Sequence, residues 1–144
     1  MIRHAGLIAL RLAGRWRGAL IEGPSGVGKS DLALRALATG FRLVADDRVV
    51  VFASGGRLYG KPPAALAGLL EVRGLGVAPQ PALDFCEVTM IARCVDTPSA
   101  VERLPEPQFD TLLDVRVPVF DLWPLEPAAP AKITRMLQHL GVPL

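Results

Sequence analysis

Apolar runs alternate with glycine- and proline-containing turns along the chain, and their lengths predict one mixed α/β domain with more strand than helix. Short apolar runs bounded by turn residues indicate buried strands. Strands are expected at 5–12, 18–22, 41–45, 48–53, 57–60, 83–93 and 115–122. Apolar residues at helical spacing predict a helix over 29–39, and a second helix is expected over 128–140, with Pro130 near its start.

The turn residues between these runs indicate how the strands are connected. The segments 14–17 and 54–56 are expected to be the turns of two hairpins. A short helix is predicted after Pro62-Pro63, and the stretch 96–108, rich in Pro and Glu, is predicted to be a loop. Pro118 is expected at a sheet edge or a bulge, because proline donates no hydrogen bond to a neighbouring strand.

The segment between the strand at 18–22 and the helix at 29–39 reads Gly-Pro-Ser-Gly-Val-Gly-Lys-Ser. The spacing G-x-x-x-x-G-K-S is typical of a phosphate-binding loop, whose backbone N–H groups surround phosphate oxygens. A glycine-rich turn that matches by chance is the alternative, and the flanking strand and helix argue against it. The residues expected to bind the nucleotide are Gly23, Pro24, Ser25, Gly26, Val27, Gly28, Lys29 and Ser30. Lys29 is expected to reach the phosphates and Ser30 to bind Mg²⁺.

Two adjacent acidic residues, Asp46 and Asp47, follow the strand at 41–45. A helix over 29–39 runs about 16 Å from the loop, and a strand over 41–45 returns by about the same length. If that strand is parallel to the one before the loop, both carboxylates lie beside the phosphates, where ligands bind in open α/β sheets. In an extended chain the two side chains point to opposite sides. The alternative is an acidic turn in which Arg48 pairs with one of them.

Composition changes this picture little. The chain has 144 residues, of which 51% are hydrophobic, and a net charge of +2, which is too small to indicate a nucleic-acid partner. We expect Cys86 and Cys94 to be buried thiols rather than a disulfide. No apolar stretch is long enough to span a membrane, and the first residues do not resemble a signal peptide, so a cytoplasmic enzyme is expected.

A third motif, Leu-Glu-Val-Arg-Gly-Leu-Gly at 70–76, follows the phosphate loop and the Asp46-Asp47 pair. Together, in this order and spacing, the three motifs resemble the catalytic domain of HPr(Ser) kinase/phosphorylase. The resemblance covers most of the chain and is strongest between 18 and 77. It implies a phosphate-loop fold of the phosphoenolpyruvate-carboxykinase-like type, with a strand-rich sheet and flanking helices, as a single domain over 1–144.

The resemblance also implies an activity, transfer of phosphate from ATP to a serine of the phosphocarrier protein HPr, with Mg²⁺ as cofactor. It matches Lys29 and Ser30 to the phosphate-loop lysine and metal ligand, Asp47 to the base that accepts the serine proton, and Asp46 to its acidic neighbour. The implied roles of three further residues are a second metal ligand for Glu71, a histidine before the phosphate-loop hairpin for His4, and a catalytic arginine for Arg103.

Each of these three residues has an alternative. His4 is alternatively a solvated residue, Arg103 a surface residue of a proline-rich loop, and Glu71 a partner of Arg73 on one strand face. The family's N-terminal domain and its basic segment linked to dephosphorylation are not recognisable, so the resemblance implies the kinase activity and leaves the phosphorylase activity doubtful. The family forms hexamers, which makes a homo-oligomer an expectation here. The alternative function is an ATP-binding sensor with little transfer activity, and a small-molecule kinase is a weaker third option.

Overall fold

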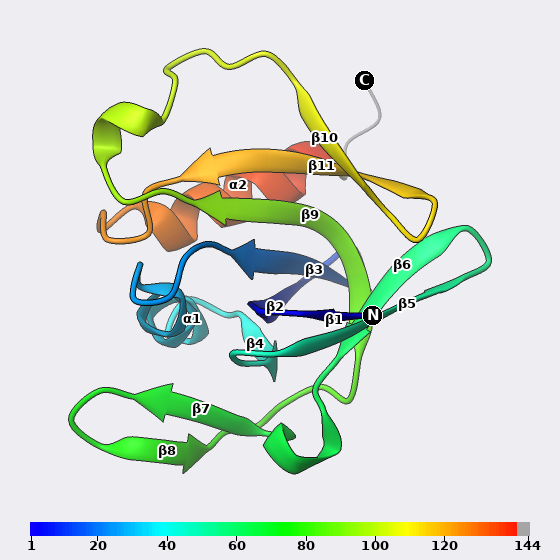
Figure 1. The fold of residues 1–144 in the computed structure, drawn as a ribbon, viewed down its shortest axis with the longest axis vertical. Helices are drawn as coiled ribbons and strands as arrows, with labels where there is room; N and C mark the ends of the chain where they lie inside the picture. The colour runs from blue at the N-terminus through cyan, green and yellow to red at the C-terminus, as the bar shows by residue number, and fades with distance from the viewer. Residues whose placement is uncertain (141–144) are drawn as a thin grey trace.

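One curled sheet and two helices make up most of the molecule in the computed structural model, which describes residues 1–140 (Figure 1). The strands of the main sheet are β1 (Ile2–Arg3), β2 (Ala5–Leu12), β3 (Arg15–Glu22), β4 (Arg42–Ala45), β5 (Val49–Ser54), β6 (Arg57–Lys61), β9 (Cys86–Cys94), β10 (Gln108–Leu112) and β11 (Val115–Leu122). The helices are α1 (Lys29–Leu37) and α2 (Ala129–Leu140). A separate hairpin consists of β7 (Leu69–Val72) and β8 (Gly76–Pro79).

Strand order explains how distant segments meet. The sheet runs β1-β5-β6-β9-β3-β2-β4, and β11 pairs with β9 and with β10. β3 and β9 are parallel, as are β9 and β11. β4 is antiparallel to β2, which is antiparallel to β3, so β4 and β3 point the same way with β2 between them. The carboxyl ends of β4, β3, β9 and β11 therefore lie along one edge of the sheet.

The sheet buries an apolar core on each face. On one face, Ile8, Ile21 and Met90 pack against α1 and α2, with Leu32 and Ile133 fully buried. The other face, which includes Leu7 and Leu20, is covered by β5, β6, β10 and β11 as the sheet curls. In β2, Leu7 and Ile8 point to opposite faces of the sheet and enter different cores, so the strand is buried on both faces. This explains the mostly apolar run from which the strand was predicted. Burial of each such Leu or Ile contributes about 1.5–3 kcal/mol.

The predicted elements exist, but several bounds differ. β3 begins at Arg15 rather than at 18, since the tight turn occupies only positions 13–14, where Ala13 and Gly14 have positive φ. The helix predicted to reach residue 39 ends at Leu37, and Gly40 follows with a φ of 98°. The short helix after Pro62-Pro63 is one 3₁₀ turn at Ala64–Leu66.

Strand β10 is an element that the sequence prediction missed. Residues 96–108 were assigned to a loop and nothing was assigned to 109–112, yet Gln108–Leu112 pairs with β11 along its whole length. Pro118 lies opposite Phe109 of β10, and the pairing of β11 with β9 begins only at Val119. On its β9 side, β11 therefore has no partner strand at Pro118, which confirms the predicted edge position. In the described part of the chain, neither α-helix is long and apolar enough to cross a membrane.

Candidate active site at the carboxyl edge of the sheet

The loop at 23–28 connects the end of β3 to the start of α1. Two of its glycines are required by the conformation: Gly28 has a φ of 114°, and a β-carbon at Gly23 would lie 2.9 Å from the Cβ of Cys94. Lys29 folds back over the loop, and its Nζ donates to the carbonyl oxygens of Gly23 (2.7 Å) and Pro24 (3.0 Å). An ammonium group and a helix N-terminus at one loop suit an anionic ligand.

Asp46 occupies the centre of the candidate site. It is 7% exposed, and it is the only polar or charged side chain among the buried residues of the described chain. The Ser30 hydroxyl donates to its Oδ1 at 2.8 Å, and the backbone N–H of Glu71 donates to its Oδ2 at 3.0 Å. The carboxylate therefore joins α1, the end of β4 and β7, which brings together the three motifs found in the sequence.

Asp47 is held in a strained turn rather than in the extended conformation assumed from sequence. Its φ is 69°, and the N–H of Arg48 donates to the carbonyl of Asp46 at 2.8 Å across this single residue. A hydrogen bond closed over one residue with positive φ defines the rare, strained form of the γ-turn. Strain of this kind gathers at functional sites. The side chains do separate as predicted, since that of Asp47 is 75% exposed while Asp46 is buried.

The alternative expected from the sequence, an ion pair between Arg48 and one of the aspartates, is weak. The Nε of Arg48 lies 3.9 Å from Oδ2 of Asp47, and both side chains are more than half exposed. Solvent-exposed pairs at such distances contribute little to stability. The Asp47 carboxylate is therefore accessible to a second molecule.

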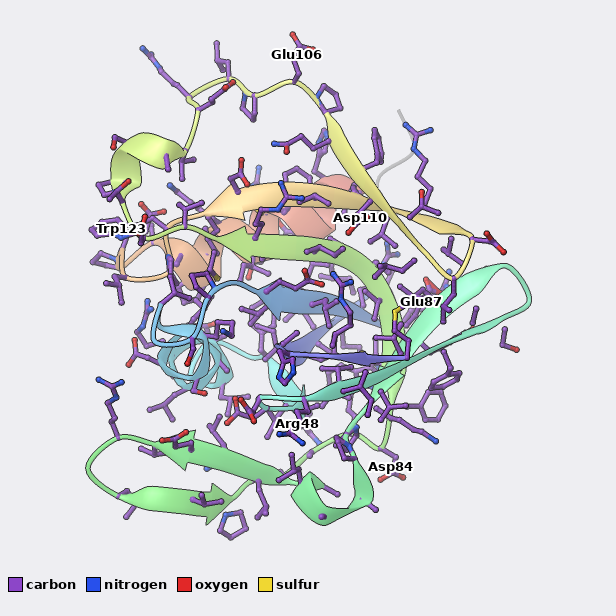
Figure 2. All side chains as sticks on the ribbon, in the orientation of Figure 1. Arg48, Asp84, Glu87, Glu106, Asp110 and Trp123 are labelled. Carbon is purple, nitrogen blue, oxygen red and sulfur yellow. The ribbon has the colours of Figure 1, made fainter. Side chains whose placement is uncertain are left out.

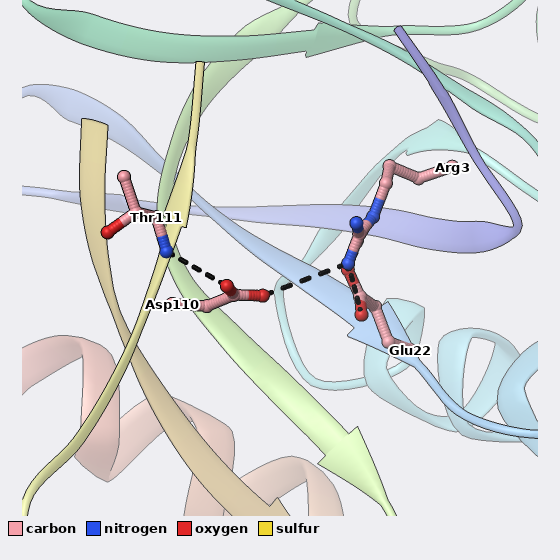
Figure 3. Close-up of polar contacts among 4 residues, drawn as sticks. All are labelled: Arg3, Glu22, Asp110 and Thr111. Atoms are coloured by element: carbon pink, nitrogen blue, oxygen red, sulfur yellow. Dashed lines mark hydrogen bonds and ion pairs between the residues drawn. The ribbon is translucent and has the colours of Figure 1, made fainter. Parts of the chain in front are cut away.

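His4 lies in the bend between β1 and β2, and the residues on each side of it are anchored to the site. The Nη2 of Arg3 donates to both carboxylate oxygens of Glu22, at 2.6 and 2.8 Å, and lies 3.9 Å from Oδ2 of Asp110 in β10 (Figure 3). The N–H of Ala5 donates to the carbonyl of Asp47 at 3.1 Å. The exposed imidazole is thus brought to the same edge as the aspartates. The Arg3–Glu22 pair was not predicted, because the two residues belong to no motif.

Glu71 reaches the site through its backbone. Its N–H contacts Asp46, while its side chain and that of Arg73 are exposed. Residues 73–75, in the third motif, form the turn of the β7–β8 hairpin, in which the Leu75 side chain is 74% exposed. Among residues 1–140 no cluster of three or more His, Cys, Asp or Glu side chains could hold a metal ion. Ser30 Oγ and the nearby carboxylates are the hard oxygen donors that Mg²⁺ prefers.

Arg103 lies apart from these residues. It is exposed, and it lines a cavity formed by the segment 98–108, β11 and α2, to which no residue of the phosphate loop contributes. The structure therefore unites Lys29, Ser30, Asp46, Asp47, His4 and Glu71 along one edge, but not Arg103.

The segment 123–126 contacts the phosphate loop on the side away from β4, and the sequence did not predict this contact. The side chain of Leu125 comes within 3.0 Å of the position that a β-carbon would take at Gly28. Arg35 of α1 pairs with Asp31 and donates to the carbonyl oxygens of Pro124 and Glu126. The only signal in the sequence was Arg35 at helical spacing from Asp31, which does not reveal a contact 91 residues away.

The two cysteines are buried, unpaired thiols, as predicted. Burial raises the pKa of Cys86 to about 12, and the charge of Glu87 acts in the same direction. Burial likewise raises the pKa of Cys94 to about 12, although nearby Lys29 opposes the shift. Neither thiol is therefore a nucleophile at neutral pH.

The region that contains this site matches one protein family. The family model described as the HPr serine kinase C-terminal domain matches residues 5–82, more than half of the chain. The chain belongs to this family. The matched range holds the phosphate loop, the Asp46-Asp47 pair and the β7–β8 hairpin, and so almost all of the candidate site.

Curated relatives of this HPr kinase-family domain match over a shorter range. The HPr kinase/phosphorylase of Streptococcus thermophilus is 54% identical over 61 residues, which are 42% of this chain and 20% of the relative. That of Clostridium tetani is 50% identical over 66 residues, 46% of this chain and 22% of the relative. The matched segment thus spans about a fifth of each relative's length.

The fold is shared with a solved structure over almost the whole chain. The Hpr(Ser) kinase/phosphatase from Coxiella burnetii superposes with a TM-score of 0.81, covering 96% of this chain and 95% of that one at 21% identity. This match confirms the expected fold class, including the part after residue 82 that the family model does not cover.

Proposed function

We propose that this domain transfers the γ-phosphate of ATP, bound with Mg²⁺, to a serine of an HPr-type phosphocarrier protein. The observation that carries the proposal is the joint placement of Ser30, Asp46 and Asp47. A buried carboxylate bonded to the phosphate-loop serine stands next to an exposed carboxylate held by a strained turn. Membership of the HPr serine kinase family supports the same activity.

The proposed reaction assigns each group one task. The serine Oγ attacks the γ-phosphorus, the Asp47 carboxylate accepts the hydroxyl proton, and the bond from γ-phosphorus to the bridging oxygen breaks, so that ADP leaves with that electron pair. Lys29 turns from the Gly23 and Pro24 carbonyls toward the phosphates and offsets their charge. Positioning and charge neutralisation supply most of the rate in such transfers.

Ser30 and Glu71 are the proposed protein ligands of Mg²⁺. Magnesium at phosphate sites takes one or two protein ligands and completes its shell with phosphate oxygens and water. When bound, the metal would neutralise charge on the β- and γ-phosphates. The exposed His4 imidazole, anchored beside Asp47, is proposed to contact the acceptor. A cytoplasmic location and a homo-oligomer stay predictions.

The transfer reaction itself is the test of this proposal. The protein is incubated with γ-³²P-labelled ATP, Mg²⁺ and an HPr-type carrier, and with the same carrier bearing alanine in place of its acceptor serine. We expect label in the first carrier and none in the second. ATP binding by calorimetry without label in any HPr-type carrier would instead identify the domain as a nucleotide sensor.

A further inference from the structure

A cavity of about 650 Å³ lies between the segment 98–108, β11 and α2. None of the residues that meet at the candidate active site lines it. Its volume is within the usual range for small-molecule sites. Phe120 and Trp123 of the β11 end and Met136 of α2 line it together with prolines of the 98–108 segment. An aromatic and apolar wall of this kind suits a flat, uncharged ring system.

The cavity is separated from the phosphate loop by a single segment of chain. Trp123 and Glu126 line the cavity, and Leu125 between them packs against Gly28 of the loop. Arg35 of α1 holds this segment by hydrogen bonds to its carbonyl oxygens. Figure 2 shows Trp123 at the end of β11, on the side of the molecule where β3 leads into α1.

The strand spacing places the cavity within reach of a nucleotide bound at the loop. β3, β9 and β11 are parallel neighbours, and the loop follows β3 while Trp123 follows β11. Two strand spacings are about 10 Å, which is comparable to the length of a nucleotide from its phosphates to its base. Ligands of open α/β sheets bind across such carboxyl ends.

The charges of the cavity fix the orientation of such a ligand. Its lining carries four carboxylates, of Glu102, Glu106, Asp121 and Glu126, against the cations of Arg103 and Lys132. Lys132 is moreover ion-paired with Glu126, and Arg93 approaches Asp121 at 3.8 Å. These pairs leave Glu102 and Glu106 against Arg103, and this excess of negative charge disfavours phosphate groups, whereas Lys29 and the N-terminus of α1 attract them.

We propose that this cavity binds the base and ribose of the donor nucleotide, with Trp123 as its aromatic wall, while the phosphates lie on residues 23–30. The inference rests on the proposed use of ATP and adds to it the site of the nucleoside. The acceptor then approaches from the opposite side of β3, where His4 precedes β2 and Asp47 follows β4.

Tryptophan fluorescence tests this inference directly, because the chain has only two tryptophans, Trp16 and Trp123. The Trp16→Phe variant leaves Trp123 as the only reporter and does not alter the cavity. We expect MgATP to change its emission with the same Kd that calorimetry gives. Inorganic tripolyphosphate should compete with ATP for the loop yet leave the emission unchanged.

A second variant measures the contribution of the aromatic wall. Trp123→Ala should weaken ATP binding at least tenfold with the affinity for tripolyphosphate unchanged, and Trp123→Phe should restore much of the loss. ATP binding that leaves Trp123 emission unaltered would overturn the nucleoside site alone, as would an equal loss for ATP and tripolyphosphate. Failure of both ATP and tripolyphosphate to bind in calorimetry would overturn the proposed function as well.

Discussion

On the β4 side of the phosphate loop, a buried carboxylate receives two hydrogen bonds from Ser30 and Glu71, and Leu70 beside it is fully buried. On the β11 side, the segment 95–107 is exposed except for Val95 and Val101, which are partly buried, and Leu104 is 88% exposed. The first side offers fixed polar groups, whereas the second borders a cavity. Under the proposed function, the β4 side would carry out the transfer, which needs precise placement, and the β11 side would hold the nucleoside.

The largest effect on stability is expected from truncating a buried side chain on the β4 side. Leu70→Ala removes a fully buried side chain and should destabilise the protein by about 2–5 kcal/mol. Leu104→Ala, the matched change on the β11 side, should alter stability by less than about 0.5 kcal/mol. Urea denaturation of both variants measures the difference. Equal losses would mean that the two sides are not packed differently.

The next effect is expected at the loop between the two sides. A β-carbon in Gly23→Ala would lie 2.9 Å from the Cβ and 3.0 Å from the carbonyl oxygen of Cys94, so the loop must move. A displacement of about 1 Å should reduce the transfer rate about 10²-fold. Gly6→Ala is the control, because its β-carbon meets nothing closer than 3.7 Å. Unchanged kinetics in Gly23→Ala would contradict the contact.

A smaller loss is expected from the buried carboxylate. Asp46→Ala leaves the N–H of Glu71 and the hydroxyl of Ser30 without their acceptor, which should cost about 1–3 kcal/mol of stability. Asp84→Ala, an exposed aspartate with no hydrogen bond or ion pair in the described structure, is the control. If the two variants unfold at the same urea concentration, Asp46 does not join the three motifs.

The smallest effect concerns the thiols at the two ends of β9. Because burial raises the pKa of both thiols from 9.0 to about 12, their contribution to stability is complete below pH 9 and is lost as pH rises toward 12. Cys86→Ala and Cys94→Ala variants each leave one thiol to react with Ellman's reagent at pH 8. We expect slow labelling of both until the protein unfolds. Fast labelling of Cys94 but not of Cys86 would contradict the burial of Cys94 beside the loop at 23–28.

The sequence predicts the β4 side well because local signals determine it. Strand, loop and helix around Gly23–Ser30 are adjacent in the chain, and matching lengths bring Asp46 back to the loop. The γ-turn at Asp47 was not predictable, since its strain is imposed by hydrogen bonds of Arg48 and Ala5 to the turn's carbonyls. The Arg3–Glu22 pair likewise depends on the pairing of strands and not on spacing.

The β11 side was poorly predicted for the opposite reason. β10 is a short segment, Gln-Phe-Asp-Thr-Leu, whose strand conformation depends on β11. The cavity and the contact of Leu125 with Gly28 join residues far apart in the chain. Arg103 was assigned by resemblance, and the structure places it beside this cavity, so its predicted catalytic role stays untested.

The most direct test of the central claim compares Asp47→Asn with Asp114→Asn. Both aspartates are exposed, with φ of 69° and 64°, and asparagine tolerates this conformation well, so both variants should fold. We predict that Asp47→Asn retains ATP binding in calorimetry and loses about 10²–10⁴-fold in the rate of phosphate transfer to the HPr-type serine. Asp114→Asn should match the unsubstituted protein in both measurements. Transfer at the full rate by Asp47→Asn would contradict the account.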